Sequence, residues 1–282
     1  MDGKNNISTI IQDWPDNITR YLEDFIKLAS RIFGPKKIIS GMIFGSHSKN
    51  EVIPISDCDL IFIVDNSITR EEIDESRPLF NALELKHGLR KQPTNIIEKI
   101  LTHVEKNTGM YVNYFISSYK DFNERNATKI FSLSTILGYL LAPLKLVLGS
   151  SVRDAHTFFG KDLVSDWIPE IPRATQIMKS LMMNIALALG SIFIAPITRS
   201  ANKYTLEACK WTLYASYYYL FQKSPFLSSA IEIFKNIGIS KSFLLRFRYY
   251  RQKNSVNVMF FLENLFQVIK IHVKALVYRK RV

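Results

Sequence analysis

The stretch from Met42 to Asp65, MIFGSHSKNEVIPISDCDLIFIVD, constrains the fold of this chain more than any other segment. Its first apolar run stops at Gly45-Ser46, a ten-residue loop follows, and a second apolar run begins at the end of Asp57-Cys58-Asp59. Short apolar runs bounded by turn signals are typical of buried strands, so we predict two strands joined by a long hairpin loop. Alternation along the second strand places Asp57 and Asp59 on one face, about 6–7 Å apart. Two such carboxylates facing a Gly-Ser turn predict half of a magnesium–nucleotide site.

The composition indicates a folded protein of a reducing compartment. The chain has 282 residues, of which 47% are hydrophobic and 22% charged, so it can bury a core and form one large or two smaller domains. Only two cysteines are present, Cys58 and Cys209, which excludes a disulfide framework and offers no zinc spacing. The polar N-terminus, MDGKNNIST, lacks the apolar segment of a signal peptide, so we expect a cytoplasmic location.

The net charge of +12 is distributed unevenly along the chain. Residues 171–282 hold 17 Lys and Arg against three acidic residues, a net charge of +14, whereas residues 1–170 have a net charge of −2. Pro169 and Pro172 lie where the charge changes sign. We therefore predict a first domain at 1–170 and a basic second domain at 171–282, which could attract a polyanion or a phosphorylated substrate.

Periodicity and turn residues predict a mixture of helices and strands in the first domain. We expect a capped helix from Asp16-Asn17 to Gly34-Pro35, strands at Ile38–Phe44 and Leu60–Val64, a helix from a Thr69 capping box toward Leu85, a helix at Asn95–Lys106, a strand at Met110–Ser118, and an apolar helix from Ile130 that leads to a strand-like piece at Leu144–Leu148. Pro78 should kink or divide the helix that follows Thr69.

The second domain has a helical pattern throughout. Four helices are predicted, at Thr175–Phe193, Lys203–Phe221, about Leu227–Ile237 and Val256–Tyr278, which favours an antiparallel bundle. The segment Leu181–Ile197 has about the minimum length of a membrane span, but it contains a central Asn184 and ends at Pro196. We expect a buried bundle helix there, with membrane contact as the alternative.

Gly45-Ser46, a ten-residue spacing and Asp57-x-Asp59, placed between apolar runs, resemble the signature of the minimal nucleotidyltransferases of the DNA polymerase beta superfamily. A looser similarity covers Phe159–Leu163, which resembles the Gly-Asp-Leu segment that closes the catalytic domain of kanamycin- and streptomycin-type antibiotic nucleotidyltransferases. Those enzymes carry a C-terminal helical domain, and Lys203–Phe221 is similar to one of its helices. The resemblance implies an α+β fold, with a small mixed-sheet nucleotidyltransferase domain followed by a helical bundle.

The resemblance also implies a chemistry, the transfer of a nucleoside monophosphate from a nucleoside triphosphate, with ATP as the expected donor, to an acceptor hydroxyl. Asp57 and Asp59 would hold Mg²⁺, whose preferred ligands are carboxylate, phosphate and water oxygens. Gly45 would let the backbone approach the phosphates, and the Ser46 hydroxyl and nearby N–H groups would bind their oxygens. His47 and Lys49 lie in the same loop and could add positive charge.

One departure from the family pattern concerns a third carboxylate, which active members carry on a later strand within an apolar-acid-apolar triplet. The corresponding triplet here is Val112-Asn113-Tyr114, and an amide cannot serve as a base. Glu84, Glu98 and Asp121 are the alternatives. Either the third acid comes from one of these positions, or the site binds a nucleotide without efficient transfer.

Several other polar residues admit both functional and structural interpretations. Lys161-Asp162 could contact the nucleotide or form a turn, and Lys203 and Lys210 could bind phosphate or pair with Glu207. The cluster RFRYYRQK, residues 246–253, could contact RNA or fringe a helix that packs on a core.

Two functional classes are compatible with these features. The first is a Mg²⁺-dependent nucleotidyltransferase whose acceptor is a hydroxyl of a small molecule, an RNA or a protein, with RNA contact through the basic domain. The second is a catalytically weak or inactive protein of the same fold, antitoxin-like, that binds nucleotide or RNA. A homodimer is compatible with either.

Overall fold

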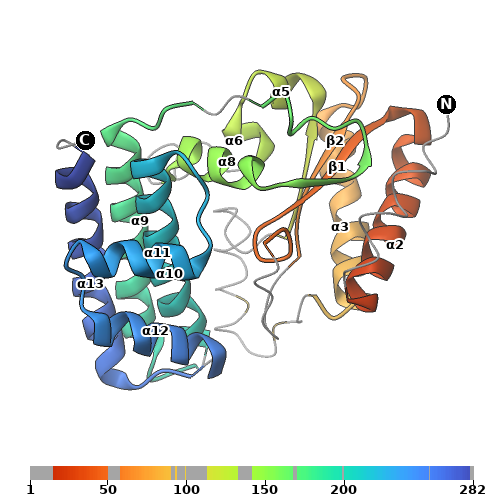
Figure 1. Ribbon diagram of the computed structural model, residues 1–282. Helices are drawn as coiled ribbons and strands as arrows, with labels where there is room; N and C mark the ends of the chain where they lie inside the picture. The colour runs from red at the N-terminus through yellow and green to blue at the C-terminus, as the bar shows by residue number, and fades with distance from the viewer. Residues whose placement is uncertain are drawn as a thin grey trace. The chain divides into compact units, whose positions relative to one another are not determined.

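The computed structural model describes residues 15–49, 58–89, 93, 99, 113–132, 142–167, 170–198, 200–253 and 255–279. The chain divides into two compact units. The sheet unit comprises Met1–Val52, Ser56–Gly138 and Asp154–Trp167, and the helical unit comprises Ile53–Ile55, Tyr139–Arg153 and Ile168–Val282. A mixed sheet followed by a helical region confirms the predicted α+β class (Figure 1). The division differs from a boundary at residue 170 chiefly because residues 139–153 group with the helical unit.

The described residues of the sheet unit form a four-stranded sheet in the order β3-β2-β1-β4. β1 (Ile38–Phe44) pairs antiparallel with β2 (Asp59–Val64), as the sequence predicted. β3 (Tyr114–Ser118) lies parallel to β2 and falls within the predicted strand at 110–118, of which 110–112 are outside the described residues. β4 (His156–Gly160), which the sequence analysis missed, pairs antiparallel with β1.

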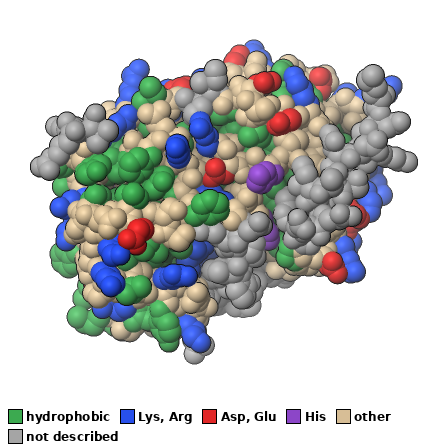
Figure 2. Space-filling view, viewed as in Figure 1, with side chains coloured by type: hydrophobic (Ala, Val, Ile, Leu, Met, Phe, Trp, Pro, Cys, Tyr) green, Lys and Arg blue, Asp and Glu red, His purple; other side chains and the backbone are tan. Residues whose placement is uncertain are grey.

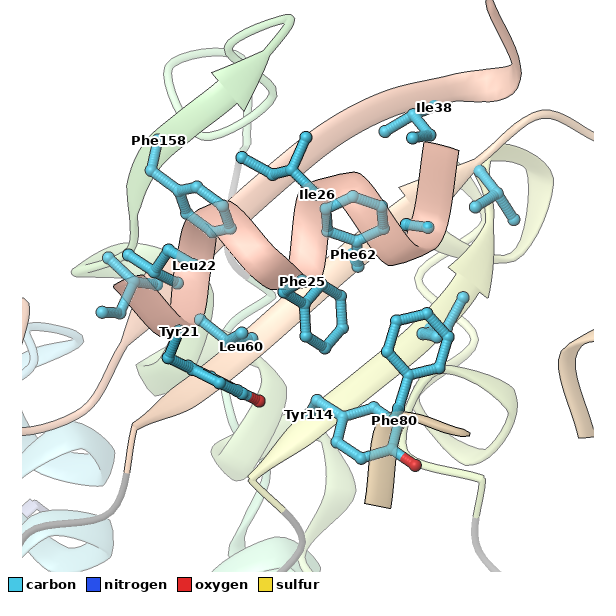
Figure 3. Packing of buried hydrophobic residues seen from close by; sticks show 14 of the residues in the cluster. Tyr21, Leu22, Phe25, Ile26, Ile38, Leu60, Phe62, Phe80, Tyr114 and Phe158 are labelled. Atoms are coloured by element: carbon cyan, nitrogen blue, oxygen red, sulfur yellow. The ribbon is translucent and has the colours of Figure 1, made fainter. Parts of the chain in front are cut away.

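Two helices pack on one face of this sheet. α2 (Asp16–Phe33) buries an apolar stripe that includes Tyr21, Leu22 and Phe25, because these residues recur at helical spacing. α3 (Arg70–Lys86) begins at the predicted capping box, in which Thr69 and Glu72 exchange side-chain-to-backbone hydrogen bonds. The rings of these helices meet those of the sheet in one aromatic core (Figure 3).

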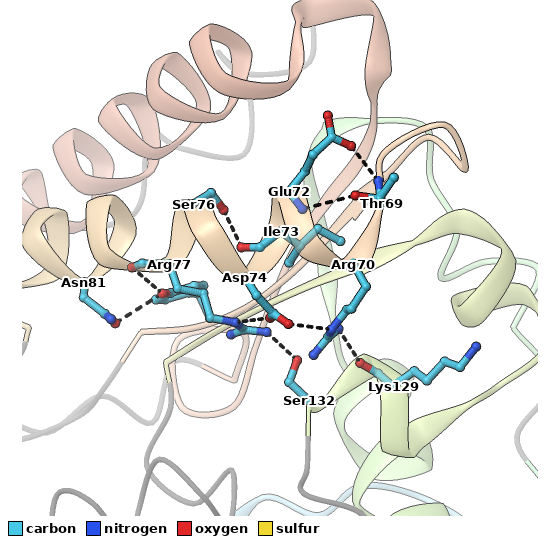
Figure 4. A network of polar contacts seen from close by, with 11 residues as sticks. Thr69, Arg70, Glu72, Ile73, Asp74, Ser76, Arg77, Asn81, Lys129 and Ser132 are labelled. Atoms are coloured by element: carbon cyan, nitrogen blue, oxygen red, sulfur yellow. Dashed lines mark hydrogen bonds and ion pairs between the residues drawn. The ribbon is translucent and has the colours of Figure 1, made fainter.

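α3 continues as one helix through Pro78, so the expected division at this residue is wrong. Contacts on both sides of the proline hold the helix together. Tyr114 bonds both the Arg77 carbonyl and the Asn81 side chain, and Phe80 packs on Phe25 with ring centroids 4.5 Å apart (Figure 4 shows the polar contacts). Pro78 removes one helical hydrogen bond, and this packing offsets the loss.

Short helices connect the later part of the sheet unit. α5 (Tyr119–Asn123) and α6 (Ala127–Ile130) follow β3, and α3 is tied to this region by Arg70 and Arg77, which donate to the Lys129 carbonyl and the Ser132 hydroxyl (Figure 4). The predicted helix at 95–106 lies outside the described residues, apart from residue 99.

The predicted strand-like piece at Leu144–Leu148 is wrong, because these residues open helix α8 (Leu144–Arg153) of the helical unit. Leu146, Gly149 and Val152 are buried at helical spacing. A five-residue apolar run does not distinguish a strand from a buried helix, and here tertiary packing on Ile177 and Tyr218 decides for the helix.

The described part of residues 171–282 contains five helices where four were predicted. They are α9 (Ala174–Ile194), α10 (Ser200–Phe221), α11 (Leu227–Asn236), α12 (Lys241–Lys253) and α13 (Val258–Arg279). The additional helix, α12, contains many aromatic residues and arginines and lacks a clean apolar period. Its burial of Phe243, Phe247 and Arg251 at four-residue spacing appears only once the fold is known.

Candidate functional site

The candidate site lies at the end of the sheet where β1 stops and β2 begins. Phe44 pairs with Asp59 in the β1–β2 ladder, so the turn after β1 lies beside the Asp59 carboxylate. Gly45 has a φ of +79°, and a Cβ at this position would lie 2.5 Å from Asp59 Oδ2. Glycine is favoured here, because the backbone conformation strains any other residue and a side chain would displace the adjacent carboxylate.

The Gly45–Lys49 turn is held to the beginning of β4 by long-range contacts. Ser48 Oγ donates to the Gly45 carbonyl at 3.0 Å, and the Lys49 N–H donates to the Ser46 carbonyl at 3.3 Å. His156 Nε2 donates to the Ser48 carbonyl at 3.0 Å, since a carbonyl can only accept. Lys49 Nζ forms an ion pair of 3.0 Å with Asp154 Oδ2. The turn is thus preformed rather than loose.

Two residues of this turn differ from their expected surroundings. His47 is 3% exposed, and neither of its ring nitrogens has a hydrogen-bond partner in the described part of the chain. Burial lowers the pKa of His47, which disfavours the positive charge that was expected of it. Lys49 forms an ion pair with Asp154, and this pair anchors the turn.

Sequence reasoning did not identify Asp154 and His156 as parts of the site. Both positions come from a strand pairing that joins residue 43 to residue 156. A pairing between strands so far apart in the sequence cannot be predicted from a local pattern. The alternating segment HTFFG at 156–160 is the single sequence signal that could have suggested an additional strand.

Asp59 and the core residues of β2 lie on opposite faces of the sheet. Cys58, Leu60 and Phe62 belong to the core under α2 and α3. Alternation therefore turns Asp59 toward the opposite face. Asp57, two residues earlier, lies outside the described residues.

Asn113 lies where the family pattern has its third acid. The Leu60 N–H donates to the Asn113 carbonyl at 2.7 Å, so the backbone of Asn113 runs beside the beginning of β2. The side-chain amide of Asn113 donates to the Leu89 carbonyl at 3.3 Å and the residue is buried. Asn113 therefore has a structural role next to Asp59 and no acidic function.

The other acids considered for the site, Glu84 and Asp121, lie in different surroundings. Glu84 is a buried residue of α3 and is 2% exposed. Burial of Tyr21 raises the pKa of its hydroxyl, and the negative charge of Glu84 raises it further. Asp121 follows the opposite end of β3, because parallel pairing sets Leu60 against Tyr114 and Val64 against Ser118. Asp121 pairs with Lys129 at 3.1 Å. Glu98 is outside the described residues, and within the described ones no group of three His, Cys, Asp or Glu side chains could hold a metal ion.

The Phe159–Leu163 segment has a structural explanation. Gly160 has a φ of +74°, and a Cβ there would collide with the Ile39 carbonyl oxygen. Asp162 Oδ1 accepts hydrogen bonds from Thr157 and from the Val164 N–H, which closes the turn after β4. Leu163 is buried. This segment supports β1 from its outer side and thereby supports the strand that carries Gly45.

Two of the basic residues considered for phosphate or RNA contact in the helical unit form internal ion pairs. Lys210 pairs with Glu207 at 2.6 Å, and Arg246 of the 246–253 cluster pairs with Glu263 at 2.5 Å. Arg251 is buried near Cys209, whereas Arg248 and Tyr249 remain exposed. These contacts favour the structural interpretation for most of this cluster.

Comparisons with known proteins give a likeness at the level of the fold. No protein-family model and no curated protein matches the chain. The crystal structure of spectinomycin adenyltransferase AAD(9) from Enterococcus faecialis with ATP and spectinomycin covers 91% of this chain and 98% of its own, with a TM-score of 0.53 and 9% sequence identity. This likeness shows that the chain shares the fold of that adenyltransferase, at the level of the fold alone.

Proposed function

We propose that this chain is a nucleotidyltransferase, which transfers a nucleoside monophosphate from a nucleoside triphosphate to a hydroxyl of a small molecule. The observation that carries the proposal is the fit of Gly45 against the Asp59 carboxylate at the turn between β1 and β2. It is supported by the shared fold with an adenyltransferase that was crystallised with ATP and spectinomycin. ATP is the proposed donor.

Asp59 has the chemistry that Mg²⁺ requires, a carboxylate beside space that Gly45 leaves open. We propose that Asp59, together with Asp57, holds the ion. When bound, Mg²⁺ supplies charge neutralisation to the phosphate groups of the donor.

The chain's own residues supply binding and orientation. We propose that backbone N–H groups of the Gly45–Lys49 turn and the Ser46 hydroxyl donate hydrogen bonds to the phosphate oxygens. The contacts of this turn with Asp154 and His156 reduce the ordering that nucleotide binding would require. The neutral form of His47, which burial favours, can offer a ring nitrogen to a polar partner.

The first experiment asks where a label from the nucleotide goes. The purified protein is incubated with each α-labelled nucleoside triphosphate and Mg²⁺, with aminocyclitol and aminoglycoside acceptors, total RNA or total protein. Labelling of a small acceptor that disappears in the Asp57→Asn, Asp59→Asn double variant supports the proposal. Full activity in that variant contradicts the site.

A second candidate function is nucleotide binding without efficient transfer, which Asn113 favours. In that case the protein binds Mg²⁺–ATP but transfers nothing to any acceptor. Asn113→Glu would then place an acid beside Asp59 and is expected to produce measurable transfer. Transfer by the natural protein at rates that Asn113→Glu does not increase would contradict this second candidate.

A further inference from the structure

Helix α9 buries several small and polar residues together with Ile177 and Met183, and it exposes other large apolar residues. Ser180, Asn184, Ala188 and Ser191 are buried within the helical unit. The opposite side presents Met178, Met182, Leu189 and Phe193, and Phe193 is 75% exposed. A bundle helix in water normally has the reverse arrangement. The expectation of a buried helix at Leu181–Ile197 therefore holds for one face of α9 only.

Helix α13, which packs beside α9, also exposes large apolar residues, although it buries others such as Phe260 and Ile271. Its buried side includes Asn264 and His272, both fully inaccessible to solvent. Its exposed side carries large apolar residues at three- and four-residue spacing, which are Leu262, Phe266, Ile269, Val273 and Val277. Such a stripe predicts that the face is covered by another apolar surface.

The buried polar groups form hydrogen bonds with one another, and these bonds fix how the helices pack. Asn184 Nδ2 donates to Ser180 Oγ at 3.2 Å, and Ser180 Oγ lies 3.1 Å from His272 Nε2. Asn264 Nδ2 donates to both the carbonyl and the hydroxyl of Thr205 on α10. Because α9, α10 and α13 are held by these contacts, their orientation is fixed and the apolar faces stay outward.

The exposed apolar area is large. The nine side chains named above on α9 and α13 are each 38–75% exposed. Phe193 and Phe266 contribute most, because an aromatic side chain has about 150–250 Å² of surface and these two are 75% and 69% exposed. Hydrophobic side chains also gather on the visible surface of the helical unit in Figure 2. The largest apolar patch of a soluble monomer is about 300–600 Å², and larger ones mark interaction sites.

Charge identifies the kind of surface that would cover these faces. The three acids of residues 171–282, Glu207, Glu232 and Glu263, are all paired within the unit, with Lys210, Lys235 and Arg246. The one charged residue within α9 is Lys179, and the exposed Lys270 and Lys274 border the stripe of α13. An anionic partner fits this +14 segment, whereas a second copy of the chain would bring like charges together.

We propose that the α9–α13 face docks on the surface of an anionic lipid bilayer. Large apolar side chains would enter the boundary between headgroups and acyl chains, and the bordering lysines would contact lipid phosphates. Among the described helices, α9 alone has the length and apolar composition of a membrane span, a test that core helices of soluble proteins also pass. Its inner side is fixed against α10 and α13, so the face lies on the bilayer and α9 does not cross it.

The test is cosedimentation of the full-length protein with vesicles. One set contains phosphatidylcholine alone and the other contains phosphatidylcholine and phosphatidylglycerol in equal parts. We expect binding to the anionic set, reduced at least about tenfold by Phe193→Gln with Phe266→Gln and also about tenfold by Lys270→Glu with Lys274→Glu. Leu79→Gln, which changes an exposed leucine of the sheet unit, is the control and should bind as the natural protein does.

Three results would overturn the proposal that this face binds an anionic bilayer. Absence of binding to anionic vesicles, or binding that the Phe193→Gln, Phe266→Gln variant retains in full, overturns the proposal. A natural protein that is dimeric by light scattering, with a monomeric double variant and no vesicle binding, assigns the face to a second copy instead. Circular dichroism of each variant verifies that the helices are intact.

Discussion

At the scale of single residues, Gly45 and Asp59 define the candidate site because each restricts the other. The left-handed backbone of Gly45 turns the chain directly over the Asp59 carboxylate. Both residues could be predicted from sequence, since their importance follows from a local spacing between two apolar runs. The surroundings of Glu84, Asn113 and Asp121 could not be predicted, because they depend on how distant strands and helices pair.

Gly45→Ala should weaken ATP binding by tenfold or more, because the new methyl group would collide with Asp59. The left-handed conformation adds a stability cost of about 1–2 kcal/mol. Gly88 is the matched control, since it has a φ of +70° and no atom near the place of a Cβ. Gly88→Ala should show the same stability cost in urea unfolding with unchanged ATP binding by calorimetry. Equal binding in the two variants would argue against a nucleotide site at Gly45.

Glu84→Gln should leave nucleotide transfer unchanged, because Glu84 is buried on α3, whereas strand alternation turns Asp59 to the face opposite the core. Asp59→Asn should abolish it. The measurement is initial transfer rate at saturating ATP, and thermal unfolding verifies that each variant is folded. A loss of transfer in Glu84→Gln with intact folding would make Glu84 the missing acid.

At the scale of elements, the network of Ser180, Asn184 and His272 joins α9 to α13. The Val268 carbonyl accepts at 2.8 Å from His272 Nδ1, so this nitrogen carries the proton and Nε2 accepts from Ser180. The neutral ring is therefore the form that fits. Burial lowers the pKa of His272 to about 4.

This network predicts acid sensitivity of the helical unit. The unfolded state binds a proton at His272 below about pH 6.5, whereas the folded state does so only near pH 4, so stability falls as the pH is lowered through this window. The difference amounts to on the order of 3 kcal/mol. Urea unfolding at pH 7.5 and pH 4.5 should show this loss in the natural protein and a smaller one in His272→Gln. Equal losses, or an imidazole that titrates near 6.5 by NMR, would contradict the assignment.

The elements also show which sequence signals were sufficient. β1 and β2 were predicted from short apolar runs that end at turn residues, α2 from its helical period and α3 from its capping box. α8 and β4 were not, since five-residue apolar runs take their conformation from their neighbours. α12 was missed because arginines and aromatic residues interrupt its sequence, so its buried residues do not form a continuous apolar stripe.

At the scale of the whole molecule, the proposed catalytic and docking residues belong to different units. Gly45 and Asp59 are in the sheet unit, and Phe193 and Phe266 are in the helical unit. The two activities should therefore respond to different substitutions.

Asp59→Asn should abolish nucleotide transfer and leave binding to anionic vesicles unchanged. The Phe193→Gln, Phe266→Gln variant should do the opposite and retain transfer in free solution. Both properties are measured on the same preparations. If one substitution removes both while circular dichroism stays unchanged, the two functions are coupled and the assignment to separate units is wrong.

The position of α8 has a practical consequence for anyone who wishes to express the units separately. The chain leaves the sheet unit before α8 and returns to it for β4. A fragment that ends at residue 170 would keep α8 but lose Ile177 and Tyr218, on which its Leu146 packs. Such a fragment should aggregate through this exposed helix. Replacing residues 139–153 with a short flexible linker in the same fragment should give a soluble four-stranded sheet.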